Sequence, residues 1–98
     1  RDKYGRTAFI IACQKSQTDI VKLLLDHSSK SIELNAQDYN GMTAIMFACG
    51  NGHKDVVQLL LDCPEIQLHF RDEYGNTAFG VAAFNGHNDV VQLFLNAP

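Results

Sequence analysis

The segment CGNGHKD, Cys49 to Asp55, holds residue types that could serve three kinds of chemistry. Gly50 and Gly52 bracket an asparagine, as in glycine loops that hold phosphate groups. Cys49 and His53 could supply two ligands of a metal site, or a nucleophile and its base. The same residues also suit a turn between two helices. Which interpretation applies decides most of what this chain does.

Each chemical interpretation lacks residues that it needs. Zinc takes four ligands, and no second cluster of Cys or His lies near Cys49 and His53 in the sequence. The glycine loop has no third glycine and no Gly-Lys-Ser/Thr ending. No Gly-x-Ser-x-Gly, His-Glu-x-x-His or paired catalytic carboxylates occur elsewhere. We therefore expect no enzymatic activity, no metal, no cofactor and no small-molecule substrate.

The chain contains three similar segments that align without a gap. They are DKYGRTAFIIACQKSQTDIVKLLLD from Asp2, DYNGMTAIMFACGNGHKDVVQLLLD from Asp38 and DEYGNTAFGVAAFNGHNDVVQLFLN from Asp72. Such self-similarity indicates a repeat protein, in which each unit buries its apolar face against the next. We predict one domain, residues 1–98, with repeats at approximately 2–37, 38–71 and 72–98.

Each repeat predicts the order turn, helix, turn, helix. Asp-x-x-Gly is typical of a tight turn, and the threonine that follows suits a helix N-cap. The segments AFIIAC, AIMFAC and AFGVAA are too short to be stable alone, so neighbouring repeats must bury them. Gly52 and Gly86 suit the left-handed position after a helix, and DIVKLLL, DVVQLLL and DVVQLFL have helical apolar spacing. The predicted fold is an all-α solenoid.

These repeats resemble the ankyrin repeat family. The resemblance rests on D-x-x-G-x-T-A, A-[CA]-x-x-G-H and D-[IV]-V-x-L-[LF]-L, and it covers nearly all of the chain. It implies an ankyrin-repeat solenoid of three turn-helix-turn-helix units. Three sets of positions depart from the family pattern: Ala8, Ala44 and Ala78 replace proline, Ile10, Met46 and Gly80 replace histidine, and Ser16-Gln17 replaces Gly-His. The last departure predicts a strained or adjusted turn in the first repeat.

The resemblance also implies a function. In this family the turn tips and the exposed positions of the first helices line a concave surface that binds a protein partner. The aligned positions are Lys3, Tyr4, Arg6, Gln14 and Lys15, then Tyr39, Asn40, Met42, Gly50 and Asn51, then Glu73, Tyr74, Asn76, Phe84 and Asn85. Aromatic side chains make strong interface anchors, so the three tyrosines and Phe84 are the sharpest candidates. The alternatives are a regulatory segment of a larger multidomain enzyme and a structural spacer.

The positions of the cysteines in the repeats predict small buried thiols, and their number predicts an intracellular setting. Cys13 and Cys49 are equivalent, and Ala83 takes their place in the third repeat, so the position accepts any small apolar group. Cys63, near the end of a helix, is expected to be the most reactive thiol. Three cysteines make no disulfide framework, which favours the cytoplasm, with the nucleus as an alternative.

Histidine and asparagine side chains in the turns carry two further predictions. His53 and His87 are expected to satisfy backbone groups at the start of the following helix, with Gln17 in the same role in the first repeat. By its place in the family pattern, Asn35 is a candidate for modification by an asparaginyl hydroxylase, and His69 holds the equivalent place in the next connection. The competing prediction is that Asn35 hydrogen-bonds within its own connecting turn.

Composition narrows the class of partner. The net charge is −3 and the pI is near 5.7, which argues against nucleic-acid binding. No apolar run approaches the roughly 20 residues of a membrane span. The first 37 residues carry six Lys/Arg and four Asp/Glu, whereas the remainder is acidic. Neither end carries the polar face of a capping repeat, which predicts a piece of a longer array or an engineered one.

Overall fold

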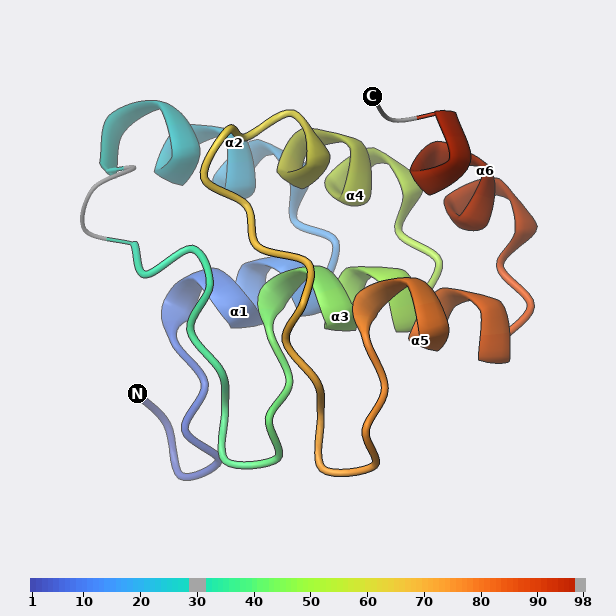
Figure 1. Ribbon diagram of the computed structural model, residues 1–98. Coiled ribbons are helices and arrows are strands. Elements are labelled where there is room, and N and C mark those ends of the chain that lie inside the picture. The colour runs from blue at the N-terminus through green and yellow to red at the C-terminus, as the bar shows by residue number, and fades with distance from the viewer. Residues whose placement is uncertain (29–31, 97–98) are drawn as a thin grey trace.

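The computed structural model describes residues 1–28 and 32–96, and within these ranges it contains six helices and no strand. The helices are α1 (Ala8–Gln14), α2 (Thr18–Ser28), α3 (Ala44–Gly50), α4 (Lys54–Leu61), α5 (Ala78–Phe84) and α6 (Asn88–Asn96). The first helices of the repeats, α1, α3 and α5, lie side by side in one row, and α2, α4 and α6 form a second row (Figure 1). The predicted all-α solenoid is confirmed.

Each first helix begins at a threonine cap, as predicted. The side-chain oxygen accepts a hydrogen bond from the backbone N–H three residues on, at 3.1 Å for Thr7, 3.4 Å for Thr43 and 3.3 Å for Thr77. Each of these helices has only seven residues, so most of its N–H groups lie in the first turn, where no intrahelical acceptor exists. The threonine cap therefore largely determines the residue at which each of these helices begins.

A tight turn precedes each first helix. The Asp38 carboxylate accepts hydrogen bonds from the N–H groups of Asn40 and Met42, both at 2.9 Å. Asp2 and Asp72 make the same pair of bonds in their own repeats. We call residues 2–5, 38–41 and 72–75 the turn tips; they project beyond the row of first helices (Figure 1).

The bend between the two helices of a repeat closes with two backbone hydrogen bonds. In the second repeat, Gly52 N–H donates to Cys49 O at 3.3 Å and His53 N–H to Ala48 O at 2.9 Å. Gly52 has a φ of +70°, which glycine adopts at no steric cost. Ser16 holds the equivalent position at +56°, which confirms the strained turn predicted for the first repeat.

The core lies between the two rows of helices and is deepest in the second repeat. Helix α3 contacts both α1 and α5, and α4 contacts both α2 and α6. Ile45, Met46 and Leu60 are almost completely buried there. Met46 and its equivalent Ile10, at the position that the resemblance would give to histidine, are buried side chains of this apolar core. None of the described helices combines the length and apolar character that a membrane crossing requires.

Candidate functional site

The segment from Cys49 to Asp55 forms the bend between α3 and α4. Burial raises the pKa of the Cys49 thiol to about 12, which keeps it protonated at neutral pH. The His53 Nε2 atom lies 3.0 Å from the carbonyl oxygen of Gln14, a residue of the preceding repeat. In the described part of the chain, no group of three His, Cys, Asp or Glu side chains is placed to hold a metal ion. The contact of His53 with Gln14 O joins this bend to the preceding repeat.

The side chains of the repeat histidines bond between repeats, so the prediction that they satisfy backbone groups at the start of the following helix is wrong; His53 is the N-cap residue of α4 but makes no side-chain cap bond there. His53 reaches the end of α1, and His87 Nε2 lies 2.8 Å from Gly50 O at the end of α3. The last carbonyls of a helix have no intrahelical donor, and an imidazole from the next repeat is placed to supply one. Gln17, expected to share this role, is exposed at the outer side of the first repeat.

The accessible cysteine does not have an activated thiol. Cys63 is partly buried, unlike Cys13 and Cys49, and its Sγ donates to Leu59 O at 3.4 Å. Burial and the nearby Glu65 carboxylate raise the pKa of the Cys63 thiol above its ordinary value. A raised pKa lowers the thiolate fraction, so the sequence expectation of a reactive Cys63 rests on accessibility alone.

The three turn tips lie next to one another and are joined through their backbones. Tyr39 N–H donates to Tyr4 O at 3.0 Å, and Glu73 N–H donates to Asn40 O at 2.9 Å. The Tyr39 ring lies so close to Gly5 that a methyl group on Gly5 would overlap it at 2.5 Å. The tips therefore form one ordered edge to which all three repeats contribute.

The predicted partner-binding residues divide by exposure. The exposed ones are Lys3, Tyr4, Lys15, Tyr39, Asn40, Asn51, Glu73, Tyr74, Phe84 and Asn85, and the half-buried ones are Arg6, Gln14, Met42, Gly50 and Asn76. Met42 packs against the core, so its role is partly structural. We call the turn tips together with the C-terminal ends of α1, α3 and α5 the tip–helix surface.

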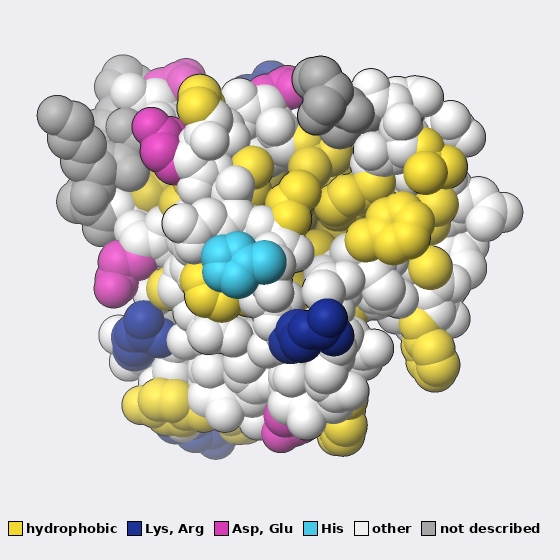
Figure 2. Space-filling view, viewed as in Figure 1, with side chains coloured by type: hydrophobic (Ala, Val, Ile, Leu, Met, Phe, Trp, Pro, Cys, Tyr) yellow, Lys and Arg dark blue, Asp and Glu magenta, His cyan; other side chains and the backbone are white. Residues whose placement is uncertain are grey.

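Four aromatic side chains of the tip–helix surface are exposed to solvent. Tyr4 is 51% exposed, Tyr39 74%, Tyr74 81% and Phe84 87%. The Tyr4 ring has two cations against it, with Lys3 Nζ 5.2 Å and the Arg6 guanidinium carbon 5.0 Å from its centroid. Hydrophobic side chains also gather on the side of the molecule formed by α5 and α6 (Figure 2).

Side-chain hydrogen bonds order the helix ends of this surface. Arg6 donates to Gln14 Oε1 at 2.7 Å, which ties the first tip to the end of α1. Asn51 donates to Gln14 O of the preceding repeat at 3.4 Å, whereas Asn85, the C-cap residue of α5, donates to Val81 O of that helix at 2.8 Å. These hydrogen bonds thus order the side chains and helix ends of the tip–helix surface within the chain itself.

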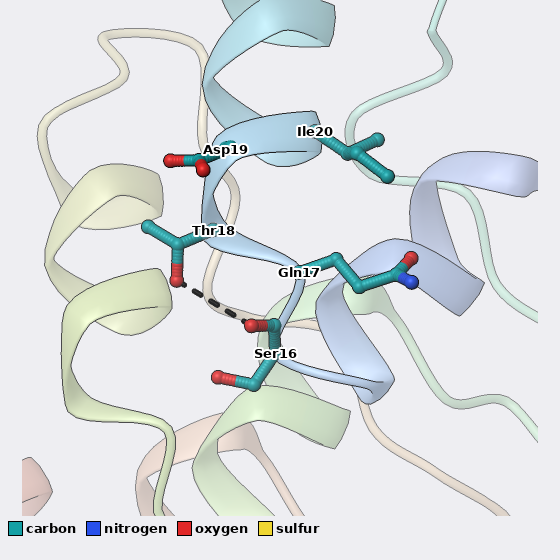
Figure 3. Close-up of a pocket in the computed structure, with 5 residues that line it drawn as sticks. All are labelled: Ser16, Gln17, Thr18, Asp19 and Ile20. Atoms are coloured by element: carbon teal, nitrogen blue, oxygen red, sulfur yellow. Dashed lines mark hydrogen bonds between the residues drawn. The ribbon is translucent and has the colours of Figure 1, made fainter.

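A shallow depression of about 440 Å³ lies at the bend between α1 and α2. It is lined by Ser16, Gln17, Thr18, Asp19 and Ile20, with Thr18 Oγ1 donating to Ser16 O at 3.5 Å (Figure 3). The Gln17 and Ile20 side chains point to the same side in this view. Asp19 is the only carboxylate among these five residues, and none of the five is a histidine, cysteine or lysine, so the depression holds no acid–base pair.

Comparison with known proteins agrees with this architecture. A family model described as ankyrin repeats in three copies matches residues 1–72 and also residues 30–98. The chain belongs to the ankyrin repeat family. Because the two matches together span the whole chain, each described helix belongs to an ankyrin repeat.

One similar solved structure is a complex of a predatory endopeptidase from Bdellovibrio bacteriovorus with an immunity protein. The TM-score is 0.82 and the sequence identity 32%, over 95% of this chain. This chain spans about half, 47%, of the relative that it matches. No curated protein sequence matches the chain.

Asn35 links two inter-repeat connections of the ankyrin stack. Its Nδ2 donates to Glu65 O at 3.0 Å, and its Oδ1 accepts from Gln67 N–H at 2.9 Å. The predicted hydrogen bond within its own turn is therefore wrong, because both amide atoms face the next connection. His69 is exposed and stacks on Phe70, with ring centroids 4.5 Å apart. Hydroxylation of Asn35 or His69 stays a prediction.

A second link between ankyrin repeats was not predicted from the sequence. Arg1 donates to Gly5 O of the first turn at 2.6 Å and to the carbonyl oxygen of Gln37, the residue directly before the second turn, at 2.9 Å. Gln37 repeats the pattern, donating to Gly41 O at 2.9 Å and to Arg71 O at 3.2 Å. The sequence indicates this link only weakly, through a long side chain with a hydrogen-bond donor directly before each Asp-x-x-Gly turn: Arg1, Gln37 and Arg71.

Proposed function

We propose that this chain is a non-catalytic protein-interaction module that binds a protein partner through the tip–helix surface. The observation that carries the proposal is the exposure of Tyr4, Tyr39 and Tyr74, at 51 to 81%, on three turn tips that are joined through their backbones, together with that of Phe84, at 87%, at the end of α5. Large exposed aromatic groups at ordered positions are typical of binding sites.

The physical basis of binding is an ordered surface. Asp2, Asp38 and Asp72 hold the turn tips through carboxylate hydrogen bonds, and backbone bonds join neighbouring tips. A partner that binds such a surface orders few additional groups, so more of the contact energy appears as affinity. Tyrosine and phenylalanine lose few rotatable bonds when they become buried, which makes them efficient anchors.

Two further observations support a protein as the partner. Ankyrin repeats generally mediate protein–protein interaction and are typically non-catalytic. The similar solved structure is itself a complex of two proteins, an endopeptidase and an immunity protein. The net charge of −3 disfavours nucleic acid as the ligand.

The test compares capture of partners by the wild-type chain, a Tyr74→Ala/Phe84→Ala double variant and a Leu23→Ala control. Leu23 is 57% exposed but lies on α2, outside the tip–helix surface. A true partner is retained by the wild type and the control, and calorimetry with that purified partner shows affinity reduced about 30-fold or more by the double variant. The melting temperature stays nearly unchanged, because both side chains are exposed. Equal affinity with a melting temperature lower by several degrees contradicts the proposal.

A further inference from the structure

The turn tips carry an ordered row of three different side chains, one from each ankyrin repeat. The residue after the aspartate that opens each tip is Lys3, Tyr39 or Glu73, and we call these three residues the tip row. Tyr39 N–H donates to Tyr4 O at 3.0 Å. Glu73 N–H donates to Asn40 O at 2.9 Å. Because these bonds join neighbouring tips, a basic, an aromatic and an acidic side chain follow one another along the edge.

The side chains of the tip row face solvent, and this exposure belongs to the turn tip itself. Tyr39 has a repeat on each side and is still 74% exposed. Lys3 and Glu73 hold the same place in their own tips and are also exposed. Hydrophobic, basic and acidic side chains reach the surface along the lower edge of Figure 2, where Figure 1 places the turn tips. A neighbouring repeat therefore leaves the tip row accessible to a partner.

No ion pair neutralises the two charged members of the tip row. Within residues 1–28 and 32–96, no ion pair includes Lys3 or Glu73. The Lys3 Nζ atom lies 5.2 Å from the centroid of the Tyr4 ring, a contact that leaves its charge uncompensated. Beside it, Arg6 Nε lies 2.7 Å from Asp2 Oδ2, so these two charges offset each other. Lys3 and Glu73 are thus available to charges on a partner.

The charges that flank the tip row leave its polarity unchanged. Arg1 Nη2 lies 3.8 Å from Glu33 Oε1, and Arg71 directly precedes Asp72, so each of these cations has a carboxylate beside it. In the middle tip, the Asp38 carboxylate is 7% exposed and accepts two backbone N–H groups. The exposed edge is therefore basic at the first repeat, uncharged at the second and acidic at the third.

The middle of the tip row offers an aromatic surface at a fixed position. The Tyr39 ring lies against Gly5 of the neighbouring tip, where an added methyl group would overlap it at 2.5 Å. Tyr4 and Tyr74 follow the charged residues of the first and third tips and are 51% and 81% exposed. An apolar side chain of a partner that covers Tyr39 therefore meets a ring that its own chain already holds.

The spacing of the repeats sets the length of polypeptide that would cover the tip row. The first helices of neighbouring repeats pack about 10 Å apart, so Lys3 and Glu73 lie about 20 Å apart. An extended polypeptide advances about 3.3 Å per residue. Side chains that reach Lys3 and Glu73 from one extended segment are therefore about six residues apart.

We propose that the tip row binds an extended segment of a protein partner that presents an acidic side chain to Lys3, an apolar one to the Tyr39 ring and a basic one to Glu73. This inference rests on the proposed function, because it specifies the partner of the same tip–helix surface. The two charges fix the direction in which the segment lies. A segment of uniform charge is attracted at one end of the row and repelled at the other.

The test selects peptides from a displayed random library on the wild-type chain, on Lys3→Glu, on Glu73→Lys and on a Lys22→Glu control. Lys22 is exposed on α2, outside the tip–helix surface, so the control changes the net charge as Lys3→Glu does. The wild type and the control are expected to enrich peptides with an acidic and a basic residue about six positions apart, with an apolar residue between them. Lys3→Glu should enrich peptides with two basic residues at that spacing, and Glu73→Lys peptides with two acidic ones.

Fluorescence anisotropy with a synthetic copy of the most enriched wild-type peptide measures the size of the effect. Lys3→Glu and Glu73→Lys are each expected to bind it about fivefold or more weakly than the wild type and the control, because one attraction becomes a repulsion. The double variant Lys3→Glu/Glu73→Lys should recover part of the affinity, since the peptide then binds in the opposite direction. Circular dichroism checks that every variant folds.

The outcomes separate this inference from the proposed function. Peptide preferences that are the same for Lys3→Glu, Glu73→Lys and the wild type overturn the inference, and so does a selection that enriches no peptide. In either case, loss of a captured partner by the Tyr74→Ala/Phe84→Ala variant leaves the proposed function standing. Retention of that partner with unchanged affinity shows that the proposed function fails as well.

Discussion

Asn35 offers the sharpest test of how the repeats are held together. Replacing it with alanine removes the donor to Glu65 O and the acceptor of Gln67 N–H, at 3.0 and 2.9 Å. Both bonds run from the connection after the first repeat to the connection after the second. The Asn35→Ala change therefore removes a link between two repeats. We therefore expect Asn35→Ala to destabilise the fold, although Asn35 lies outside the core.

The size of the effect follows from the two bonds. A hydrogen bond contributes about 0.5–1.5 kcal/mol net, and these two are partly open to water, so the loss is about 1–2 kcal/mol. In a domain of about 100 residues, 1 kcal/mol corresponds to about 4–8 °C in melting temperature. The expected decrease in melting temperature is thus about 4–16 °C. The melting temperature of Asn35→Asp should lie between those of the wild type and Asn35→Ala, because aspartate keeps the acceptor for Gln67 N–H but loses the donor to Glu65 O.

Thermal and urea unfolding followed by circular dichroism measure this change. Gln67→Ala is the matched control, because it shortens an exposed side chain and keeps the backbone N–H that Asn35 accepts. The control should remain within about 0.5 kcal/mol of the wild type. If Asn35→Ala melts at the wild-type temperature, the contact between the connections does not stabilise the fold. Peptide mass spectrometry after incubation with an asparaginyl hydroxylase separately tests the predicted modification.

Three further predictions concern the buried thiols and the bends. Because the pKa of both the Cys13 and the Cys49 thiols is about 12 in the folded chain, against an ordinary 9.0, the unfolded chain loses these protons first as pH rises. The free energy of unfolding should therefore fall above pH 9, by about 1.4 kcal/mol per thiol and pH unit, and urea unfolding of a Cys13→Ala/Cys49→Ala variant should show a flatter pH dependence. Ser16→Gly relieves a positive φ of 56° and should raise the free energy of unfolding by about 0.5–1 kcal/mol; a lower melting temperature would contradict the strain argument. Gly52→Ala should cost more than Gly86→Ala in the same urea assay, since only at Gly52 does the added methyl group also meet a neighbouring histidine ring, at 2.9 Å.

Local elements were predictable because their causes are short-range. A threonine cap, an Asp-x-x-Gly turn and a glycine at a helix end each act on backbone groups within a few residues. The strained bend at Ser16 was predictable for the same reason, by comparison with Gly52 and Gly86. The predicted exposed aromatics were also found, with Tyr74 and Phe84 above 80% exposed.

Partners across the stack were not predictable. Asn35 and His53 are polar side chains in turns, and the sequence suggested that each would bond to its own turn or helix. Their partners lie 30 or more residues away along the chain. Nothing in a local pattern specifies which carbonyl a stacked neighbour presents, because that depends on the distance and rotation between repeats.

The sequence by itself therefore determined the repeat, its helices and its caps, since three aligned copies repeat every local signal. Only the tertiary structure decided which of the equivalent residues in the three repeats are buried and which are exposed. Ile20 and Val56 hold the same place in their repeats, yet one is 44% exposed and the other is completely buried. The physical reason is that burial in a solenoid comes from the adjacent repeat, so the same residue type is core in the middle of the stack and surface at its end.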